Sequence, residues 1–146
     1  MPDVHFHLNG APVVVDGSGS LLEALRDRLG VRSAKDGCSP QGQCGCCTVL
    51  VDGQARVSCV TPVARVQGRS VTTVEGLDPH VSERWAEALC ATGGTQCGFC
   101  TPGIVVRLAA LEEKAPLDAD NVGQALLAHL CRCTGWQTIV EAAVAP

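Results

Sequence analysis

Cysteine is the residue type whose number and spacing in this sequence point most directly to chemistry. Ten of the 146 residues are cysteines, in two groups of five. The groups are Cys38, Cys44, Cys46, Cys47 and Cys59, then Cys90, Cys97, Cys100, Cys131 and Cys133. Residues 1–5 lack the basic and apolar regions of a secretory signal peptide, so a cytoplasmic location is expected. Disulfides are rare in that reducing compartment. The cysteines therefore predict metal binding.

The first group has the spacing of a plant-type 2Fe-2S loop with one residue added. Four of its members form the pattern C-x5-C-x2-C-x11-C, namely Cys38, Cys44, Cys47 and Cys59. A plant-type loop reads C-x4-C-x2-C with a distant fourth cysteine. Such a loop must bring its backbone amides close to the sulfurs, which glycine permits. Three glycines are placed for this: Gly37, Gly42 and Gly45.

The second group gives the pattern C-x2-C-x30-C-x-C. Four of its five members form this pattern, namely Cys97, Cys100, Cys131 and Cys133. Cys100 precedes a predicted helix that starts near Pro102, and Cys133 precedes the last predicted helix. Helix N-termini favour negative charge and so stabilise thiolates there. Arg132, between two of these cysteines, either offsets the charge of a cluster or is simply solvated.

Zinc binding and thiol redox chemistry are alternative uses of these cysteines. Structural zinc also takes four cysteines with x2 spacings. The pairing of C-x-C with C-x2-C, beside a plant-type loop, favours iron–sulfur clusters over zinc. Cys97 and Cys100 alone resemble a thiol redox pair, but that chemistry needs a βαβ setting and the flanking sequence predicts helix. Cys46 and Cys90 remain, and both are expected to be buried as small apolar residues.

The elements that must position the first group are strands and one helix. Two alternating apolar segments flank Asn9-Gly10, a type I′ turn sequence, and predict a hairpin. Residues 20–23 form a capping box, with Gly30 at the helix end. A second hairpin is predicted from residues 48–51 and 54–60 around Asp52-Gly53, and a last strand at residues 71–74. These elements predict a small mixed sheet with a helix across it.

Four short helices are predicted for the second group. They cover residues 79–89, a segment behind Pro102, a segment capped by Asp118 or Asp120 that runs through Leu130, and a final helix with a capping box at residues 138–141. Residues 69–79 are the predicted linker. The sequence thus divides into two units, 1–76 and 77–146. Each is small enough that a bound metal would help to stabilise its fold.

Composition excludes several classes of protein. Hydrophobic residues make up 46% and charged residues 18%, which is typical of a folded protein. The net charge of −4 argues against nucleic-acid binding, and no apolar run is long enough to cross a membrane.

The segments CGCCTVLVDG, CGFCTPG and LCRCTG, in this order, resemble the iron–sulfur subunit of the xanthine dehydrogenase and aldehyde oxidase family of molybdenum hydroxylases. The resemblance covers nearly the whole chain. It implies an α+β fold in which a β-grasp, ferredoxin-like domain precedes a four-helix domain. It also implies two 2Fe-2S clusters, with FAD on a medium partner subunit, molybdopterin on a large one, and a dimer of heterotrimers.

The resemblance further implies a role for individual residues. Cys97, Cys100, Cys131 and Cys133 would hold the cluster nearer the molybdenum, and Cys38, Cys44, Cys47 and Cys59 the one nearer the flavin. Gln96 would contact the pterin across the subunit interface. In this role the chain passes electrons from molybdenum to FAD and takes no part in the bond chemistry.

Two positions depart from the family pattern. Five residues instead of four separate Cys38 from Cys44, and Cys46 stands where alanine is usual. We expect a bulged loop around an ordinary cluster, although an altered choice among Cys44, Cys46 and Cys47 is the alternative. Two rival functions are an interaction module whose metal only stabilises the fold, and a free-standing ferredoxin.

Overall fold

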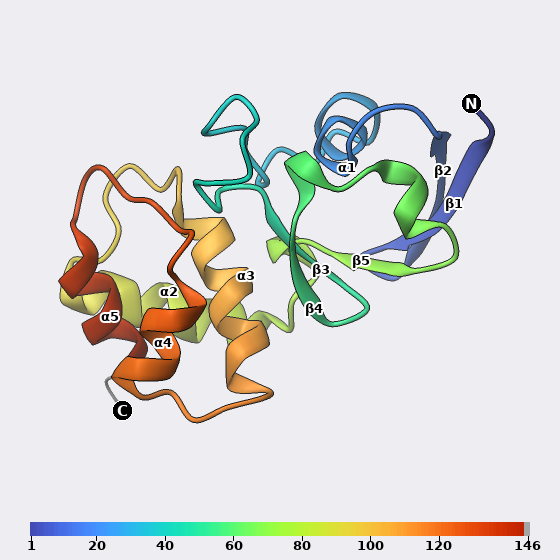
Figure 1. The fold of residues 1–146 in the computed structure, drawn as a ribbon. Coiled ribbons are helices and arrows are strands. Elements are labelled where there is room, and N and C mark those ends of the chain that lie inside the picture. The colour runs from blue at the N-terminus through green and yellow to red at the C-terminus, as the bar shows by residue number, and fades with distance from the viewer. Residues whose placement is uncertain (145–146) are drawn as a thin grey trace.

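A five-stranded mixed sheet lies at one end of the structure, a computed structural model that describes residues 1–144. The strands are β1 (Asp3–Leu8), β2 (Ala11–Asp16), β3 (Thr48–Val51), β4 (Gln54–Val57) and β5 (Ser70–Thr72). Their order is β2-β1-β5-β3-β4 (Figure 1). The β1–β5 pair is parallel and the other pairs are antiparallel. The mixed sheet expected from the sequence is confirmed.

Both hairpins turn as their sequences predict. Asn9 and Gly10 have φ values of 51° and 85°, and Asp52 and Gly53 have values of 50° and 78°. Positive φ at both central residues is the requirement of a type I′ turn, whose twist matches that of the flanking strands. The turns set the register, which pairs Leu8 with Ala11 in the first hairpin.

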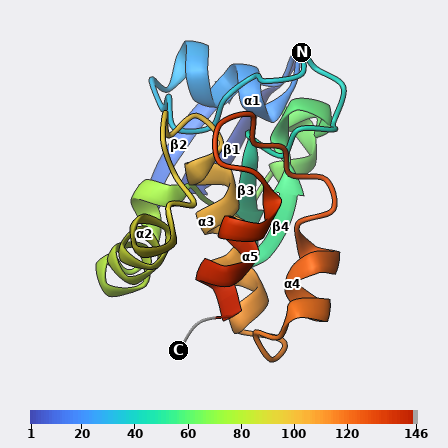
Figure 2. The same ribbon diagram turned by 90° about the vertical axis from the view of Figure 1, so that its left-hand side faces the viewer.

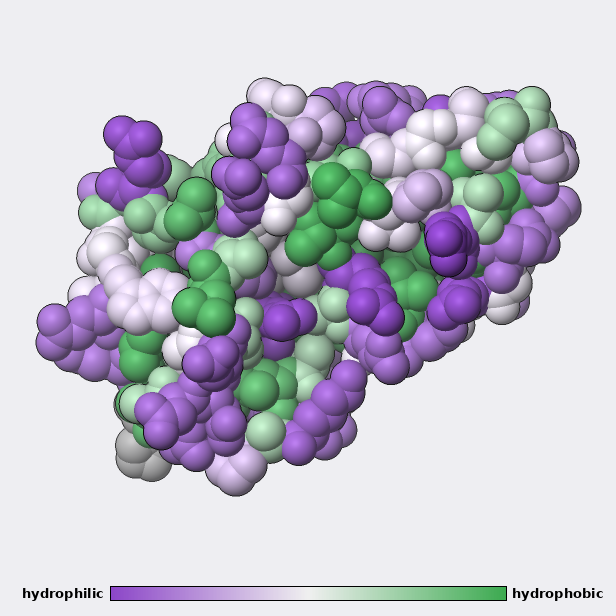
Figure 3. Space-filling view, in the orientation of Figure 1, coloured by the Kyte–Doolittle hydropathy of each residue, from purple (hydrophilic) through white to green (hydrophobic). Residues whose placement is uncertain are grey.

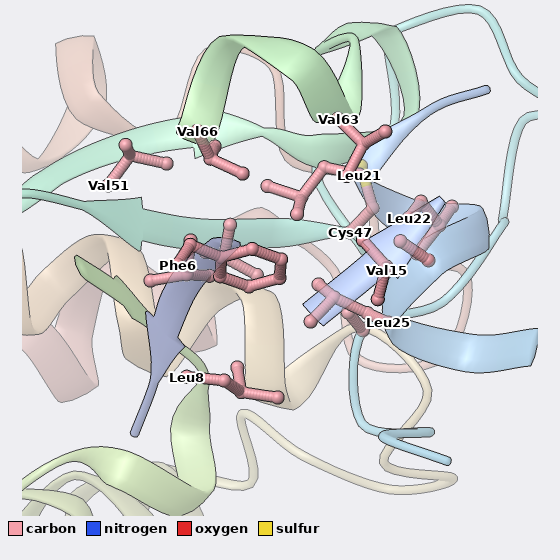
Figure 4. Close-up of a cluster of buried hydrophobic side chains, with 14 of the residues drawn as sticks. Phe6, Leu8, Val15, Leu21, Leu22, Leu25, Cys47, Val51, Val63 and Val66 are labelled. Carbon is pink, nitrogen blue, oxygen red and sulfur yellow. The ribbon is translucent and has the colours of Figure 1, made fainter. Parts of the chain in front are cut away.

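One short helix covers the sheet. Helix α1 (Leu21–Glu23) continues as a wider π-helical turn, η1 (Ala24–Arg28). The capping box is present: the Glu23 N–H donates to Ser20 Oγ at 3.1 Å, and the Ser20 N–H donates to the Glu23 carboxylate at 2.8 Å. Leu21 and Leu25 are fully buried against strand side chains such as Phe6 (Figure 4).

Four helices form the other end. They are α2 (Pro79–Thr92), α3 (Thr101–Glu112), α4 (Ala119–Ala125) and α5 (Trp136–Val144). Helix α3 lies between the other helices and the sheet, against β3 (Figures 1 and 2). A second apolar core forms here around Trp85, Leu108 and Leu126, separate from the core of the sheet. No helix in residues 1–144 is long and apolar enough to cross a membrane.

Several predicted boundaries are wrong. Strand β4 ends at Val57 and is followed by a 3-10 turn, η2 (Ser58–Val60), because the Ser58 hydroxyl donates to the Cys47 carbonyl at 2.6 Å and bends the chain. The last strand covers Ser70–Thr72 and not residues 71–74. The predicted linker at residues 69–79 therefore begins inside the sheet, and its Thr73 N–H donates to Asn9 Oδ1 at 2.9 Å.

The helical end shows similar differences. Helix α4 is capped by Asp118, one of the two predicted caps, but it stops at Ala125 and does not reach Leu130. The predicted capping box at residues 138–141 is wrong, since α5 already begins at Trp136 and the Thr138 hydroxyl donates backward to the Thr134 carbonyl at 3.2 Å. Cys90 is exposed rather than buried. It follows Leu89 directly and so points about 100° away from the buried face of α2.

Candidate metal centre

The first cysteine loop, residues 37–47, folds back so that its amides face its own sulfurs. The Gln41 N–H donates to Cys38 Sγ at 3.2 Å. A Cβ at Gly37 would lie 2.8 Å from Cys44 Sγ, so only glycine allows this approach. Gly42 and Gly45 have φ values of 67° and 72°. The loop thus surrounds its sulfur atoms with N–H groups that stabilise negative charge.

The four predicted thiols of the first group lie as two pairs. Cys38 is next to Cys44, and Cys47 is next to Cys59, while Cys46 also lies next to Cys44. The Cys59 N–H also donates to Cys47 Sγ at 3.4 Å, from the turn η2 rather than from the predicted strand. Cys47 is buried among the apolar side chains of the sheet (Figure 4).

The two pairs differ in acidity. N–H groups of Gln43, Cys44 and Gln41 together lower the pKa of Cys38 to about 6. Burial, helped by the neighbouring Cys47 thiol, raises the pKa of Cys59 to about 12. Without metal, one pair is therefore disposed to carry a thiolate at neutral pH and the other is held protonated.

The second group is also arranged as two pairs. Cys97 lies next to Cys133 on the surface, while Cys100, which is buried, lies next to Cys131. Burial and the Cys131 thiol raise the pKa of Cys100 to about 12. The pKa of Cys131 is lowered to about 7. Burial acts to raise it, but hydrogen bonds from the hydroxyl and N–H of Thr134 and from further N–H groups outweigh the effect of burial.

Two pairs of thiols are the arrangement that a 2Fe-2S cluster uses. Each of its two irons takes two protein ligands, so four sulfurs surround two metal ions rather than a single point. No three His, Cys, Asp or Glu side chains of residues 1–144 converge as ligands of one metal ion. The donor set, four thiols with nearby amides, fits the cluster in both places.

The two cysteine groups touch each other. The Leu130 N–H donates to the Cys44 carbonyl at 3.0 Å, and Leu130 is bonded directly to Cys131. Phe99, from the second group, lies against Gly37 of the first loop, with its Cε1 3.1 Å from a Cβ built there. The loops of both groups lie on one side of the molecule, at the top in Figures 1 and 2.

Close backbone packing makes this contact possible. Gly103, in the first turn of α3, is so near the first loop that a Cβ there would lie 2.3 Å from the Gly45 carbonyl oxygen. A Cβ at Gly45 would in turn lie 2.5 Å from His129 Nδ1. Cys44 and Cys46 consequently belong to the apolar core of the helices rather than to that of the sheet.

Cys46 is buried, as predicted. It is 3% exposed, and its thiol donates to the Cys44 carbonyl at 3.8 Å. Burial and the neighbouring Cys44 raise its pKa to about 12. Its environment is that of a small apolar residue.

His129 is a buried polar residue that the sequence did not reveal. It is 8% exposed, and its Nδ1 has no hydrogen-bond partner among the described residues. Burial, with Arg107 nearby, lowers its pKa to about 4, so the ring is neutral. Its position depends on Gly45, more than 80 residues earlier, which no local pattern shows.

The remaining predicted residues are on the surface. Gln96 and Arg132 are exposed, and Arg132 forms neither of the two ion pairs found in residues 1–144. His5 and His7 occupy the exposed face of β1. Gln96 is accessible to a partner, as its predicted contact requires.

Comparison with known proteins gives consistent results. Residues 73–144 match the family model described as "2Fe-2S binding domain". The chain is 38% identical to "Xanthine dehydrogenase iron-sulfur-binding subunit" of Escherichia coli O157:H7, over 92% of this chain and 87% of that one. It is 39% identical to "Aldehyde oxidase 1" of Oryctolagus cuniculus, over 97% of this chain but only 12% of that longer one.

A solved structure shows the same fold. The crystal structure of quinoline 2-oxidoreductase from Pseudomonas putida 86 contains a chain that superposes with a TM-score of 0.87. The two are 37% identical, over 99% of this chain and 91% of that one. The match along nearly the full length of separate iron–sulfur subunits establishes the relationship. This chain belongs to the 2Fe-2S subunits of the xanthine dehydrogenase and aldehyde oxidase family of molybdenum hydroxylases.

Proposed function

We propose that the chain holds two 2Fe-2S clusters and connects a molybdenum centre to a flavin in a multi-subunit oxidoreductase. Cys38, Cys44, Cys47 and Cys59 hold the first cluster, and Cys97, Cys100, Cys131 and Cys133 hold the second. The observation that carries the proposal is the arrangement of both groups as two pairs of thiols.

Bound there, the clusters supply two one-electron carriers between the partner subunits. The protein's own part is to hold thiolates, aim N–H groups at sulfur and keep one group close to the other. The link from the Cys44 carbonyl through the Leu130 N–H to Cys131 provides a short connection between the two ligand sets. Exposure of Cys97 and Cys133 supports a role of the second group at the subunit interface.

The proposal includes the architecture and the partners. The sheet and the helices form a β-grasp, ferredoxin-like domain of residues 1–76 and a four-helix domain of residues 77–146, and their two separate apolar cores support this division. The large partner carries molybdopterin, which Gln96 contacts, and performs the hydroxylation. The medium partner carries FAD, and two such trimers associate in the cytoplasm.

Metal content and spectroscopy test the proposal. After anaerobic reconstitution, the full chain should contain about four irons and show two distinct reduced signals in electron paramagnetic resonance. Cys44→Ser should abolish one signal and Cys133→Ser the other, while Cys90→Ser, which alters an exposed cysteine outside both sets, should retain both.

Other results would overturn it. A colourless protein with bound zinc and no redox activity would favour a metal-stapled interaction module. Two clusters in a chain that never co-purifies with two larger subunits, when these are co-expressed, would favour a free-standing ferredoxin.

A further inference from the structure

A groove with only positive charge in its lining lies between the β3–β4 hairpin and helices α3 and α4. We call it the basic groove. Its volume is about 450 Å³, within the range of ligand sites in proteins. Its polar lining consists of Arg56, Arg107, Lys114, Gln54, Asn121 and Gln124. In Figure 3, hydrophilic side chains line both sides of the notch between the helices and the sheet.

The three cations of the basic groove are not neutralised by carboxylates. Neither ion pair of residues 1–144 includes them, and no acidic residue lines the groove. Glu112, on α3, is turned to the opposite side, where it pairs with Arg84 at 2.7 Å. Asp118 is engaged in capping α4 through the Asn121 N–H. A chain with a net charge of −4 therefore has a local excess of positive charge here.

Each cation keeps free donors that face the groove. Arg107 uses its Nε to donate to the Ala125 carbonyl at 2.9 Å, which fixes the guanidinium and leaves its two terminal NH2 groups without partners among residues 1–144. Lys114 Nζ makes one long contact, 3.5 Å from the Gly53 carbonyl. Arg56 donates to Gln54 Oε1 at 2.8 Å through one nitrogen only. Such a set binds carboxylate or phosphate oxygens.

The spacing of the cations favours an extended ligand. The α-carbons of Arg107, on α3, and Lys114, in the turn that follows α3, are seven residues apart, which corresponds to about 10 Å at a helical rise of 1.5 Å per residue. Residues seven apart lie on the same helix face, so when both side chains extend from that face, a ligand that contacts both spans about this distance, which is more than one phosphate covers. In an extended polyproline II segment, side chains three residues apart share a face about 9 Å apart, which matches this spacing. The amides of Gln54, Asn121 and Gln124 can bond to the backbone of such a segment.

We propose that the basic groove binds an extended acidic segment of a partner polypeptide, with two carboxylates three residues apart. This inference goes beyond the electron-transfer role and does not depend on it. The groove opens at the turn of the β3–β4 hairpin, away from the cysteine loops at the top of Figure 1. It is thus a contact that orients the chain in an assembly while the cysteine side remains free for other subunits.

Peptide binding tests the proposal on the full chain with reconstituted clusters. The probe is a fluorescein-labelled peptide that contains Glu-Pro-Pro-Glu, followed by fluorescence anisotropy at low ionic strength. We expect saturable binding that weakens with added salt. A Glu-Glu-Pro-Pro peptide of equal charge should bind at least fivefold more weakly, because its carboxylates cannot reach both cations.

Variants localise the site. Arg107→Gln combined with Lys114→Gln should weaken binding about tenfold, as expected for two exposed ion pairs. Arg32→Gln, which removes the same kind of charge from an exposed position outside the groove, should have no effect. Circular dichroism and thermal unfolding check that each variant is folded. Iron content is measured in parallel, so failure to bind the peptide is distinguishable from failure to hold clusters.

Three results would overturn the proposal. Equal affinity for the two acidic peptides would show a basic surface without specificity. Tighter binding of pyrophosphate or ATP than of the peptide would identify a small phosphate ligand instead. Undiminished peptide binding by the double variant would place the interaction elsewhere.

Discussion

At the scale of single residues, the cysteines of the first group differ in the pKa of their thiols. The pKa of Cys38 in the folded apo-chain is about 6, below the ordinary value of 9.0, because N–H groups of its own loop donate to the sulfur. The ionised Cys38 thiol therefore adds to the free energy of unfolding of the apo-chain. This contribution is present in full above pH 9 and is lost as the pH falls through 6. Buried Cys59 and Cys100, with raised pKa values, stay protonated over this range.

Alkylation of the metal-free chain measures this difference. At pH 7, iodoacetamide should modify Cys38 well before Cys59 and Cys100, as followed by peptide mass spectrometry. The rate at Cys38 should fall about tenfold between pH 7 and pH 5, because the thiolate is the nucleophile. In the unfolded chain the preference should disappear. Equal rates at the three cysteines in the folded chain would contradict this assignment.

Cys46 provides a second test at the residue scale. Because its buried thiol occupies the position of a small apolar side chain, Cys46→Ala should retain both clusters and lose only about 1 kcal/mol of stability. The matched variant Cys47→Ala should lose the first cluster. Iron analysis and the two reduced signals provide the measurement. Loss of the first signal in Cys46→Ala would mean that Cys46 is a ligand, the alternative left open by the sequence.

At the scale of elements, helix α3 depends on a glycine in its first turn. Gly103→Ala should improve helix propensity, but the new Cβ would meet the Gly45 carbonyl at 2.3 Å and push α3 away from the first loop. We expect a loss of at least about 2 kcal/mol in the free energy of unfolding, as for other overpacked cores. Denaturant unfolding of the reconstituted chain measures it.

Gly123→Ala is the control for that substitution. Gly123 also lies in a helix, α4, and a Cβ there meets nothing within 4 Å. The free energy of unfolding of this variant should rise by about 0.5–1 kcal/mol, because alanine has a higher helix propensity than glycine. If the two substitutions change the free energy of unfolding in opposite directions, the packing role of Gly103 is separated from its effect on helix formation. Similar behaviour of the two variants would refute the contact.

The elements that the sequence predicted correctly are those with local causes. The type I′ turns and the capping box at Ser20 depend on residues next to one another, and they are present. Some of the boundaries that differ depend on distant partners. Strand β4 is shortened where Ser58 bonds to the Cys47 carbonyl, eleven residues earlier. The spacing of the thiols predicts the two sets of metal ligands, which stay a prediction, whereas the burial of His129 against Gly45 has no signal in the local sequence.

At the scale of the whole molecule, the two cysteine groups differ in their exposure to solvent. The first is mainly buried, whereas Cys97 and Cys133 of the second are exposed next to apolar surface at Phe99. For the chain without partners, we expect a chelator to remove the cluster of the second group first. Time-resolved loss of the two reduced signals would show the order.

The complete complex is the control for that experiment. If partner subunits cover Cys97 and Cys133, the difference in rate should decrease or vanish there. Earlier loss of the first cluster in the isolated chain would contradict the protection inferred from burial. Loss of both at one rate would indicate global unfolding rather than local access.

The hydrogen bond from Leu130 to the Cys44 carbonyl also has a consequence for biosynthesis. The ribosome adds all five cysteines of the first group more than 70 residues before it adds Leu130. During that interval, the side of the first loop later covered by Gly103 and His129 is open to water and oxidants. An iron–sulfur assembly factor could reach this loop on the nascent chain, and the newly made helices would then close over it.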